Sequence, residues 1–207
     1  DYTADSILCD YHFARGRDYL RDDEVLAALR EFELVAQYGE GVKEIYNNLG
    51  SVCAENGLFN EAIGYFRMAS EIDPRYMLAL RNVAKLHEYT GNYQKAIDYT
   101  KRILKIYPDE YETVLHLAAL YERSGQIQNA VEVYHRAIRM EPEDFRPFRS
   151  LGFILWSIPK AHRDGMLMLS KSLERNPNQP DLEQLLMGKP ATAAPLQPGA
   201  DEFGQRQ

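Results

Sequence analysis

The sequence has few cysteines, one tryptophan and no long apolar run. Its two cysteines, Cys9 and Cys53, exclude a disulfide-dense scaffold and lack the spacing of a metal site. We expect both to be small, buried hydrophobic residues. No window contains the roughly 18 consecutive apolar residues that a membrane-spanning helix needs, so we expect no direct membrane span. Acidic residues outnumber basic ones and give a net charge of −7, so we expect no nucleic acid as a partner.

The sequence also lacks the motifs that indicate an enzyme. The five histidines are scattered, and no zinc-protease, nucleophile-elbow, phosphate-loop or dinucleotide-binding pattern occurs. Carboxylates are numerous, but helical periodicity puts them on faces that we expect to be solvated. We therefore predict no catalytic residue, no cofactor and no metal ion, and we predict that the chain is not an enzyme.

What the sequence does contain is a repeat with a period of 34 residues. Pro74, Pro108 and Pro142 are evenly spaced by this period. Small residues recur in the same register, namely Gly57, Gly91 and Gly125, and Ala62, Ala96 and Ala130. A fixed period of this size is the signature of stacked structural units.

Residues 43–76 show what one unit contains. Apolar residues recur at helical spacing up to residue 53, and Gly57 then suits the left-handed position that ends a helix. A second helical pattern runs toward Pro74, which prevents the helix from continuing. In this second helix the small Ala62 lets the two backbones approach, and Phe66 fills the space beside it. Each unit is therefore predicted to be two helices joined by a tight turn.

The repeat divides the chain into a lead-in, an array and a tail. The predicted segments are a lead-in at 1–8, an array at 9–188 and a Pro-, Ala- and Gln-rich extended tail at 189–207. Within the array we expect units at about 9–42, 43–76, 77–110, 111–144 and 145–179, followed by a capping helix at 180–187. The first unit is degenerate, as terminal units often are.

The ends of the array carry further expectations. Thr3 or Asp5 is a candidate N-cap for the first helix, and Asp181 for the capping helix. In the fifth unit the turn glycine is replaced by residues 157–159, and Gly165 stands in the position that alanine occupies elsewhere. The turn is one residue longer than in the other units, and this one-residue insertion should change the geometry of the fifth helix pair.

The recurring packing residues resemble those of the tetratricopeptide repeat family in length and in the order of small and large side chains. They are Leu49, Gly50, Gly57, Ala62, Phe66, Ala69 and Pro74, with their equivalents in the next two units. The resemblance covers about residues 9–179. It implies an all-α fold, a right-handed superhelical solenoid of about five helix–turn–helix units plus a C-terminal capping helix. It also implies a concave groove, lined by the first helix of each unit, that binds peptides or other proteins.

Helical geometry indicates which side chains would line that groove. The first unit contributes Phe13 and Arg17. The candidate partner-binding residues are Asn48, Arg81, Asn82, Lys85, His116, Arg123, Arg146, Arg149 and Trp156.

These candidates fall into three chemical kinds, each with two possible roles. Asn48, Asn82 and His116 form a row that would hydrogen-bond an extended peptide backbone, similar to the asparagine ladder of O-linked N-acetylglucosamine transferases; alternatively the amides satisfy neighbouring helices. The basic residues Arg81, Lys85, Arg146 and Arg149 would receive carboxylates of a partner, or are solvated surface charges. Trp156 is a partner-facing anchor or a core residue.

Together these features predict a non-catalytic scaffold or adaptor that binds a protein or an extended peptide with acidic groups, as an accessory or assembly subunit of a larger complex. Two alternatives stay open. The chain is the recognition portion of a larger enzyme whose catalytic domain lies outside it. Or it is a self-associating scaffold, a homo-oligomer in which the acidic and aromatic tail residues Asp201, Glu202 and Phe203 occupy a groove.

Overall fold

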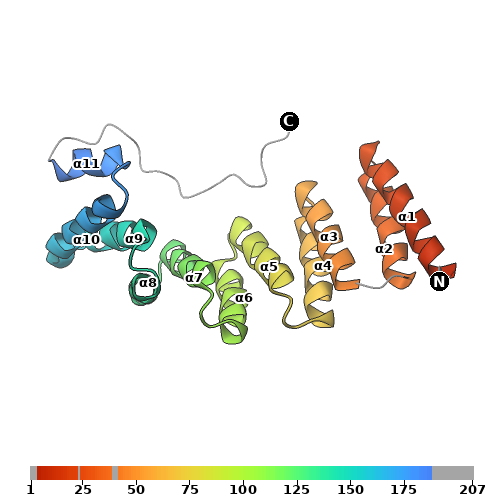
Figure 1. Cartoon of the computed structure of the whole chain (residues 1–207), viewed down its shortest axis with the longest axis horizontal. Coiled ribbons are helices and arrows are strands. Elements are labelled where there is room, and N and C mark those ends of the chain that lie inside the picture. The colour runs from red at the N-terminus through yellow and green to blue at the C-terminus, as the bar shows by residue number, and fades with distance from the viewer. Residues whose placement is uncertain (1–3, 23, 39–41, 188–207) are drawn as a thin grey trace. The chain divides into compact units, whose positions relative to one another are not determined.

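The computed structural model describes residues 4–22, 24–38 and 42–187, and these residues form helices (Figure 1). In chain order they are α1 (Ala4–Arg21), α2 (Val25–Tyr38), α3 (Val42–Glu55), α4 (Phe59–Ile72), α5 (Met77–Tyr89), α6 (Tyr93–Ile106), α7 (Tyr111–Arg123), α8 (Ile127–Met140), α9 (Phe145–Trp156), the 3-10 turn η1 (Pro159–Ala161), α10 (His162–Arg175) and α11 (Pro180–Leu186). No strand occurs in the described ranges. The all-α prediction is therefore confirmed.

Consecutive helices pack as helix–turn–helix pairs, α1 with α2 and so on to α9 with α10, as predicted. The chain forms two compact units, Asp1–Ile106 and Tyr107–Gln207. The first compact unit contains α1 to α6, and the second contains α7 to α11. The names first unit and second unit refer from here to these two compact units, and one 34-residue helix pair is called a repeat. The boundaries assigned to individual repeats from the 34-residue period stay a prediction, and the tail predicted at 189–207 lies outside the described residues.

Both ends of the array differ from the expected capping. α1 begins at Ala4, so it takes in much of the predicted lead-in, and Asp5 lies inside the helix and is not its N-cap. Thr3 lies outside the described residues. In α11 the N-cap position is Gln179, because Pro180 has no N–H to satisfy and suits the first helical position. The prediction that Asp181 is the N-cap is therefore wrong, and Asp181 lies in the first turn of α11.

The turn glycines have the backbone conformation that their position predicts. Gly57, Gly91 and Gly125 have φ angles of 75°, 75° and 74°, the left-handed region that side chains with a Cβ rarely adopt. After Gly57 the Leu58 N–H donates to the Cys53 carbonyl at 2.8 Å, which satisfies a carbonyl at the end of α3. The turn glycine thus closes the first helix of a pair and sends the chain into the second.

Inside a pair, small residues allow close contact. A Cβ at Gly50 would lie 2.6 Å from ring atoms of Phe66, so the ring packs directly on the α3 backbone. Cys53 is fully buried, and burial raises the pKa of its thiol to about 11, which keeps it protonated and unreactive. Cys9 is half-buried, with its Sγ 3.8 Å from the Val35 carbonyl oxygen. The prediction of burial holds fully for Cys53 and partly for Cys9.

One buried polar group makes the stability of the first unit depend on pH. His87 is buried between α5 and α6, stacks on Tyr99 at 5.8 Å, and its Nδ1 has no hydrogen-bond partner. Burial, and after it the charge of Lys95, lower the pKa of His87 below the ordinary value of 6.5. The unfolded chain therefore takes up this proton at a higher pH than the folded chain does. Keeping His87 neutral in the fold therefore costs no stability above the pKa that His87 has in the unfolded chain. As the pH falls below that value, the unfolded chain is protonated first and the first unit loses stability.

We expect His87→Leu to remove this part of the pH dependence. The variant should also gain about 1 kcal/mol at pH 7.5, since it eliminates a buried nitrogen without a partner. Urea unfolding of both proteins at pH 7.5 and pH 5.0 measures the effect. The carboxylates are common to both, so their contribution cancels in the comparison. An equal loss of stability at pH 5.0 in the two proteins would contradict the assignment to His87.

Candidate functional site

In the first unit the predicted asparagines lie on α3 and α5 and differ in their contacts. Asn82 Nδ2 donates to Asn47 Oδ1 at 3.0 Å, and Asn47 is only 5% exposed. Asn82 therefore takes the role of satisfying a neighbouring helix. Asn48 is exposed and makes no hydrogen bond within the part of the chain that the structure describes. Its amide thus has a donor and an acceptor available to a ligand.

Arg81 and Lys85 lie four residues apart on α5, so they share one face of the helix. Both side chains are half-buried. Arg81 Nη2 lies 3.7 Å from Met77 Sδ, one turn earlier on the same face. This face of α5 therefore carries two basic groups one turn apart.

In the second unit Arg146 is part of a network of charged groups. Its guanidinium donates to both carboxylate oxygens of Glu112 at 2.6 and 3.0 Å, and its Nε donates to Asp144 at 2.8 Å. Tyr111 donates to the same Asp144 carboxylate at 2.8 Å. Glu112 and Asp144 therefore neutralise the charge of Arg146. A carboxylate from a partner would have to displace one of them to bind this guanidinium.

The pKa values of this network shift in the directions that its hydrogen bonds require. The bonds to Glu112 and then to Asp144 raise the pKa of Arg146. Burial acts to raise the pKa of the Asp144 carboxyl, but the bonds from Arg146 and Tyr111 outweigh it and hold that pKa below its ordinary value. Burial and the bond to Asp144 raise the pKa of Tyr111. All three groups thus keep the charge states that bind them together at neutral pH.

Arg149 connects α9 to α11. Its Nη1 donates to Gln179 Oε1 at 2.9 Å and its Nη2 donates to Asp181 at 2.6 Å. Gln179 is buried and donates in turn to the Ser172 carbonyl at 3.1 Å. Arg149, predicted to meet a partner, is therefore engaged with the capping helix.

Trp156 is half-buried at the C-terminus of α9. Its Nε1 donates to His162 Nε2 at 3.1 Å, and its ring meets that of Phe153 edge-on at 6.5 Å. The residue is thus neither a fully buried core residue nor a free aromatic anchor. His116 and Arg123 are half-buried on α7 of the same unit.

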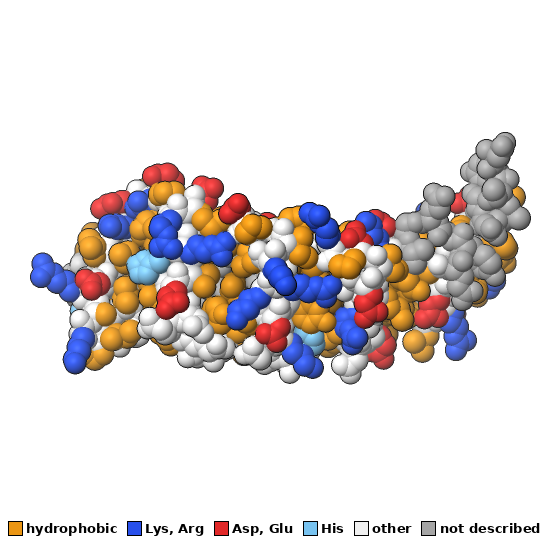
Figure 2. All heavy atoms as spheres, turned by 90° about the horizontal axis from the view of Figure 1, so that it is seen from below, with side chains coloured by type: hydrophobic (Ala, Val, Ile, Leu, Met, Phe, Trp, Pro, Cys, Tyr) orange, Lys and Arg blue, Asp and Glu red, His pale blue; other side chains and the backbone are white. Residues whose placement is uncertain are grey.

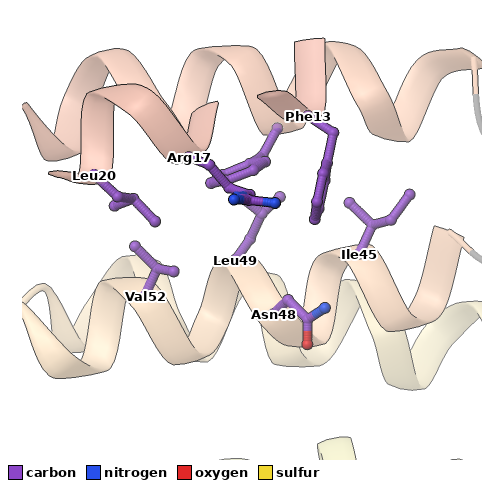
Figure 3. Close-up of a pocket in the computed structure, with 8 residues that line it drawn as sticks. Phe13, Arg17, Leu20, Ile45, Asn48, Leu49 and Val52 are labelled. Atoms are coloured by element: carbon purple, nitrogen blue, oxygen red, sulfur yellow. The ribbon is translucent and has the colours of Figure 1, made fainter. Parts of the chain in front are cut away.

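A pocket of about 230 Å³ opens between α1 and α3 in the first unit (Figure 3). Its lining is mostly apolar, with two polar side chains. The lining residues are Phe13, Arg17, Leu20, Phe32, Ile45, Asn48, Leu49 and Val52. The sequence predicted that Phe13, Arg17 and Asn48 face a groove, but nothing in it indicated that a pocket forms here.

The described residues contain neither a metal-binding group nor a membrane-spanning helix. On the face that Figure 2 shows, basic and acidic side chains are intermixed with hydrophobic ones over the described residues. Within those residues no group of three or more His, Cys, Asp or Glu side chains is arranged to hold a metal ion. None of the described helices is long and apolar enough to cross a membrane.

Two models of the tetratricopeptide repeat family match the sequence, one at residues 41–109 and one at residues 90–151. Together they cover more than half of the chain, which belongs to the tetratricopeptide repeat family. Proteins of this family mediate protein–protein interactions. A search of curated proteins found no match.

Solved structures of the same fold resemble the chain at low identity. A structure of MamA, residue 41 to the end, from Desulfovibrio magneticus RS-1 is 18% identical, with a TM-score of 0.65 over 83% of this chain and 97% of that one. A tetratricopeptide repeat protein from Parabacteroides merdae ATCC 43184 is 16% identical, with a TM-score of 0.69 over 88% and 74%. YrrB, described as having an unusual peptide-binding site, is 13% identical, with a TM-score of 0.65 over 84% and 89%. These likenesses establish the fold alone.

Proposed function

We propose that the chain is a non-catalytic scaffold or adaptor that binds a protein or an extended peptide carrying acidic groups, as an accessory subunit of a larger assembly. The observation that carries the proposal is the shared face of α5, where Arg81 and Lys85 lie one turn apart. Basic side chains bind carboxylates through charge-assisted hydrogen bonds. The peptide-binding site named for YrrB, which has the same fold, supports the proposal.

The packing of the first unit supports the same conclusion. The residues that hold α5 in place are fully buried, Leu80 and Val83 among them, and are unavailable to a ligand. Whatever this helix binds must therefore meet its partly exposed residues. In a solenoid the exposed face of each helix pair is extended and regular, which suits an extended or helical partner better than a small substrate.

Changing both Arg81 and Lys85 to Glu is expected to weaken partner binding at least about tenfold, about 1.4 kcal/mol, because two attractive contacts become repulsive. The partner is first captured from the native source with the full chain as bait and identified by mass spectrometry. Its affinity for the parent and for the double variant is then measured by calorimetry.

A matched control carries the same charge change on a different helix. Lys95→Glu with Arg102→Glu alters two exposed basic residues on α6 and should leave partner affinity unchanged. Far-ultraviolet circular dichroism of both double variants verifies that the helices are intact. If the α5 variant captures the partner as well as the parent does, this face is not the binding surface.

A further inference from the structure

The pocket between α1 and α3 has the size and lining to take an aromatic ring. Phe13 and Leu20 of α1, Phe32 of α2, and Ile45 and Val52 of α3 supply most of its wall. An apolar cavity of about 150 Å³ in another protein binds benzene. The volume of about 230 Å³ here is therefore sufficient for the side chain of a phenylalanine.

Arg17 gives the pocket a charge preference. Its side chain is exposed and makes no hydrogen bond or ion pair with any residue that the structure describes. The neighbouring arginines are paired: Arg15 with Glu31 at 3.4 Å, and Arg21 with Asp18 at 3.2 Å. Figure 3 shows the Arg17 guanidinium lying between α1 and α3, next to the apolar lining. An unneutralised guanidinium beside an apolar pocket favours a ligand with a carboxylate next to an apolar side chain.

Asn48 lies on the opposite wall, on α3. Its amide is exposed and has no hydrogen bond within the described part of the chain. An amide of this kind can donate to and accept from the backbone of one peptide residue. The pocket thus offers contacts for a ring, a carboxylate and a peptide group.

We propose that this pocket binds residues Asp201, Glu202 and Phe203 from the C-terminal tail of a second copy of the chain. The Phe203 ring enters the pocket, a carboxylate of Asp201 or Glu202 pairs with Arg17, and Asn48 bonds the adjacent backbone. The proposal rests on the peptide-binding function proposed above and names one partner for it.

Charge and symmetry support this occupant. Two consecutive carboxylates precede the ring, which complements the Arg17 guanidinium at the pocket. A reciprocal exchange of tails makes two identical contacts and closes a two-fold dimer. Because the second contact is then intramolecular, the dimer is more stable than a single peptide contact allows.

Complementation between two full-length variants tests the proposal. Arg17→Glu disables the pocket but keeps the tail, and Phe203→Ala disables the tail but keeps the pocket. In sedimentation velocity at about 100 µM the parent should form dimers and each variant alone should be monomeric. An equimolar mixture should form a heterodimer that is weaker than the parent dimer, because it retains one intact tail and one intact pocket and so makes one of the two contacts. A monomeric parent, or a variant that dimerises like the parent, overturns the proposal.

A peptide titration measures the same contact without the dimer. The probe is a synthetic peptide of residues 196–207, titrated by calorimetry into the full chain carrying Phe203→Ala. Binding should weaken at least about tenfold when Arg17→Glu is added, and a peptide with alanine at position 203 should not bind. The control Arg30→Glu makes the same charge change at an exposed position on α2, outside the pocket, and should have no effect.

The outcomes separate this proposal from the function it rests on. If the peptide does not bind, the pocket assignment fails, while loss of a captured partner with the Arg81 and Lys85 double variant still supports the scaffold function. If the peptide binds equally well to the Arg17→Glu chain, the tail docks elsewhere and the proposal is wrong.

Discussion

Replacing Gly165 with alanine is expected to destabilise the second unit by about 3 kcal/mol. A Cβ at this position would lie 2.3 Å from the Trp156 nitrogen, 2.6 Å from its Cα and 2.8 Å from the Gly152 carbonyl oxygen. All three are backbone atoms, so no side chain can rotate out of the way. α10 would have to move away from α9 and lose contact along both helices. Urea unfolding followed by the fluorescence of Trp156, the single tryptophan, measures the loss.

A second glycine provides the control with the opposite expected sign. Gly64 lies in α4, it is exposed, and a Cβ there would meet nothing within 4 Å. Gly64→Ala should stabilise the first unit by about 0.5–1 kcal/mol, because alanine restricts the unfolded chain and favours the helix; circular dichroism follows its unfolding, since Trp156 lies in the second unit. If Gly165→Ala unfolds at the same urea concentration as the parent, the close approach of α9 and α10 is wrong.

Gly165 also shows how far sequence reasoning reaches in the fold. The period of 34 residues predicted the helix pairs, because the small and large residues it repeats are those that set the contact between two helices. The buried Ala62 and Phe66 and the left-handed Gly57 are examples, since their roles follow from local geometry. At Gly165 the pattern predicted a small residue. That not even a methyl group fits depends on the distance between the backbones of α9 and α10, which the pattern does not specify.

The candidate site was less predictable, because the charges that neutralise its residues come from other helices. Helical periodicity put Arg146 and Arg149 on an accessible face but did not reveal Glu112 and Asp181 as their partners. One signal was available for Arg146. Glu112 occurs 34 residues before Arg146, at the equivalent place in the preceding 34-residue repeat, and has the opposite charge. Equivalent places on adjacent first helices lie side by side in a stacked array, so an opposite pair at one period indicates an internal ion pair.

The pocket of the first unit was not predictable from the pattern. Periodicity identified Phe13 and Arg17 as facing a groove, but a pocket depends on the space between α1 and α3. That space is set by the packing of three helices, and single-residue periodicity contains no information on it.

Replacing Leu182 with alanine is expected to release α11 from the second unit. Leu182 is the one side chain of this seven-residue helix that is fully buried. Truncating a buried leucine to alanine costs about 2–5 kcal/mol, and a helix this short has little stability of its own in water. The hydrogen bonds within α11, such as Met187 N–H to the Glu183 carbonyl at 3.0 Å, should then open. Hydrogen exchange should show loss of amide protection over residues 183–187 while α9 and α10 keep theirs.

Met187 provides the matched control, because it is adjacent to α11 but 69% exposed. Met187→Ala should change stability by less than about 0.5 kcal/mol and leave the protection of α11 intact. Unchanged protection in the Leu182 variant would mean that the polar contacts of Arg149 and Gln179 are sufficient to hold the helix. Loss that spreads through α9 and α10 would mean that α11 unfolds only together with them.

Release of α11 has a consequence for binding, because it removes Asp181 from Arg149. If Arg149 belongs to the partner-binding surface, as its position on the first helix of its pair predicts, the Leu182→Ala chain should bind an acidic partner more tightly than the parent. Calorimetry with the captured partner measures this, and adding Arg149→Ala to the Leu182 variant should abolish the gain. A gain that persists without Arg149 would assign the effect to another part of the surface that α11 covers.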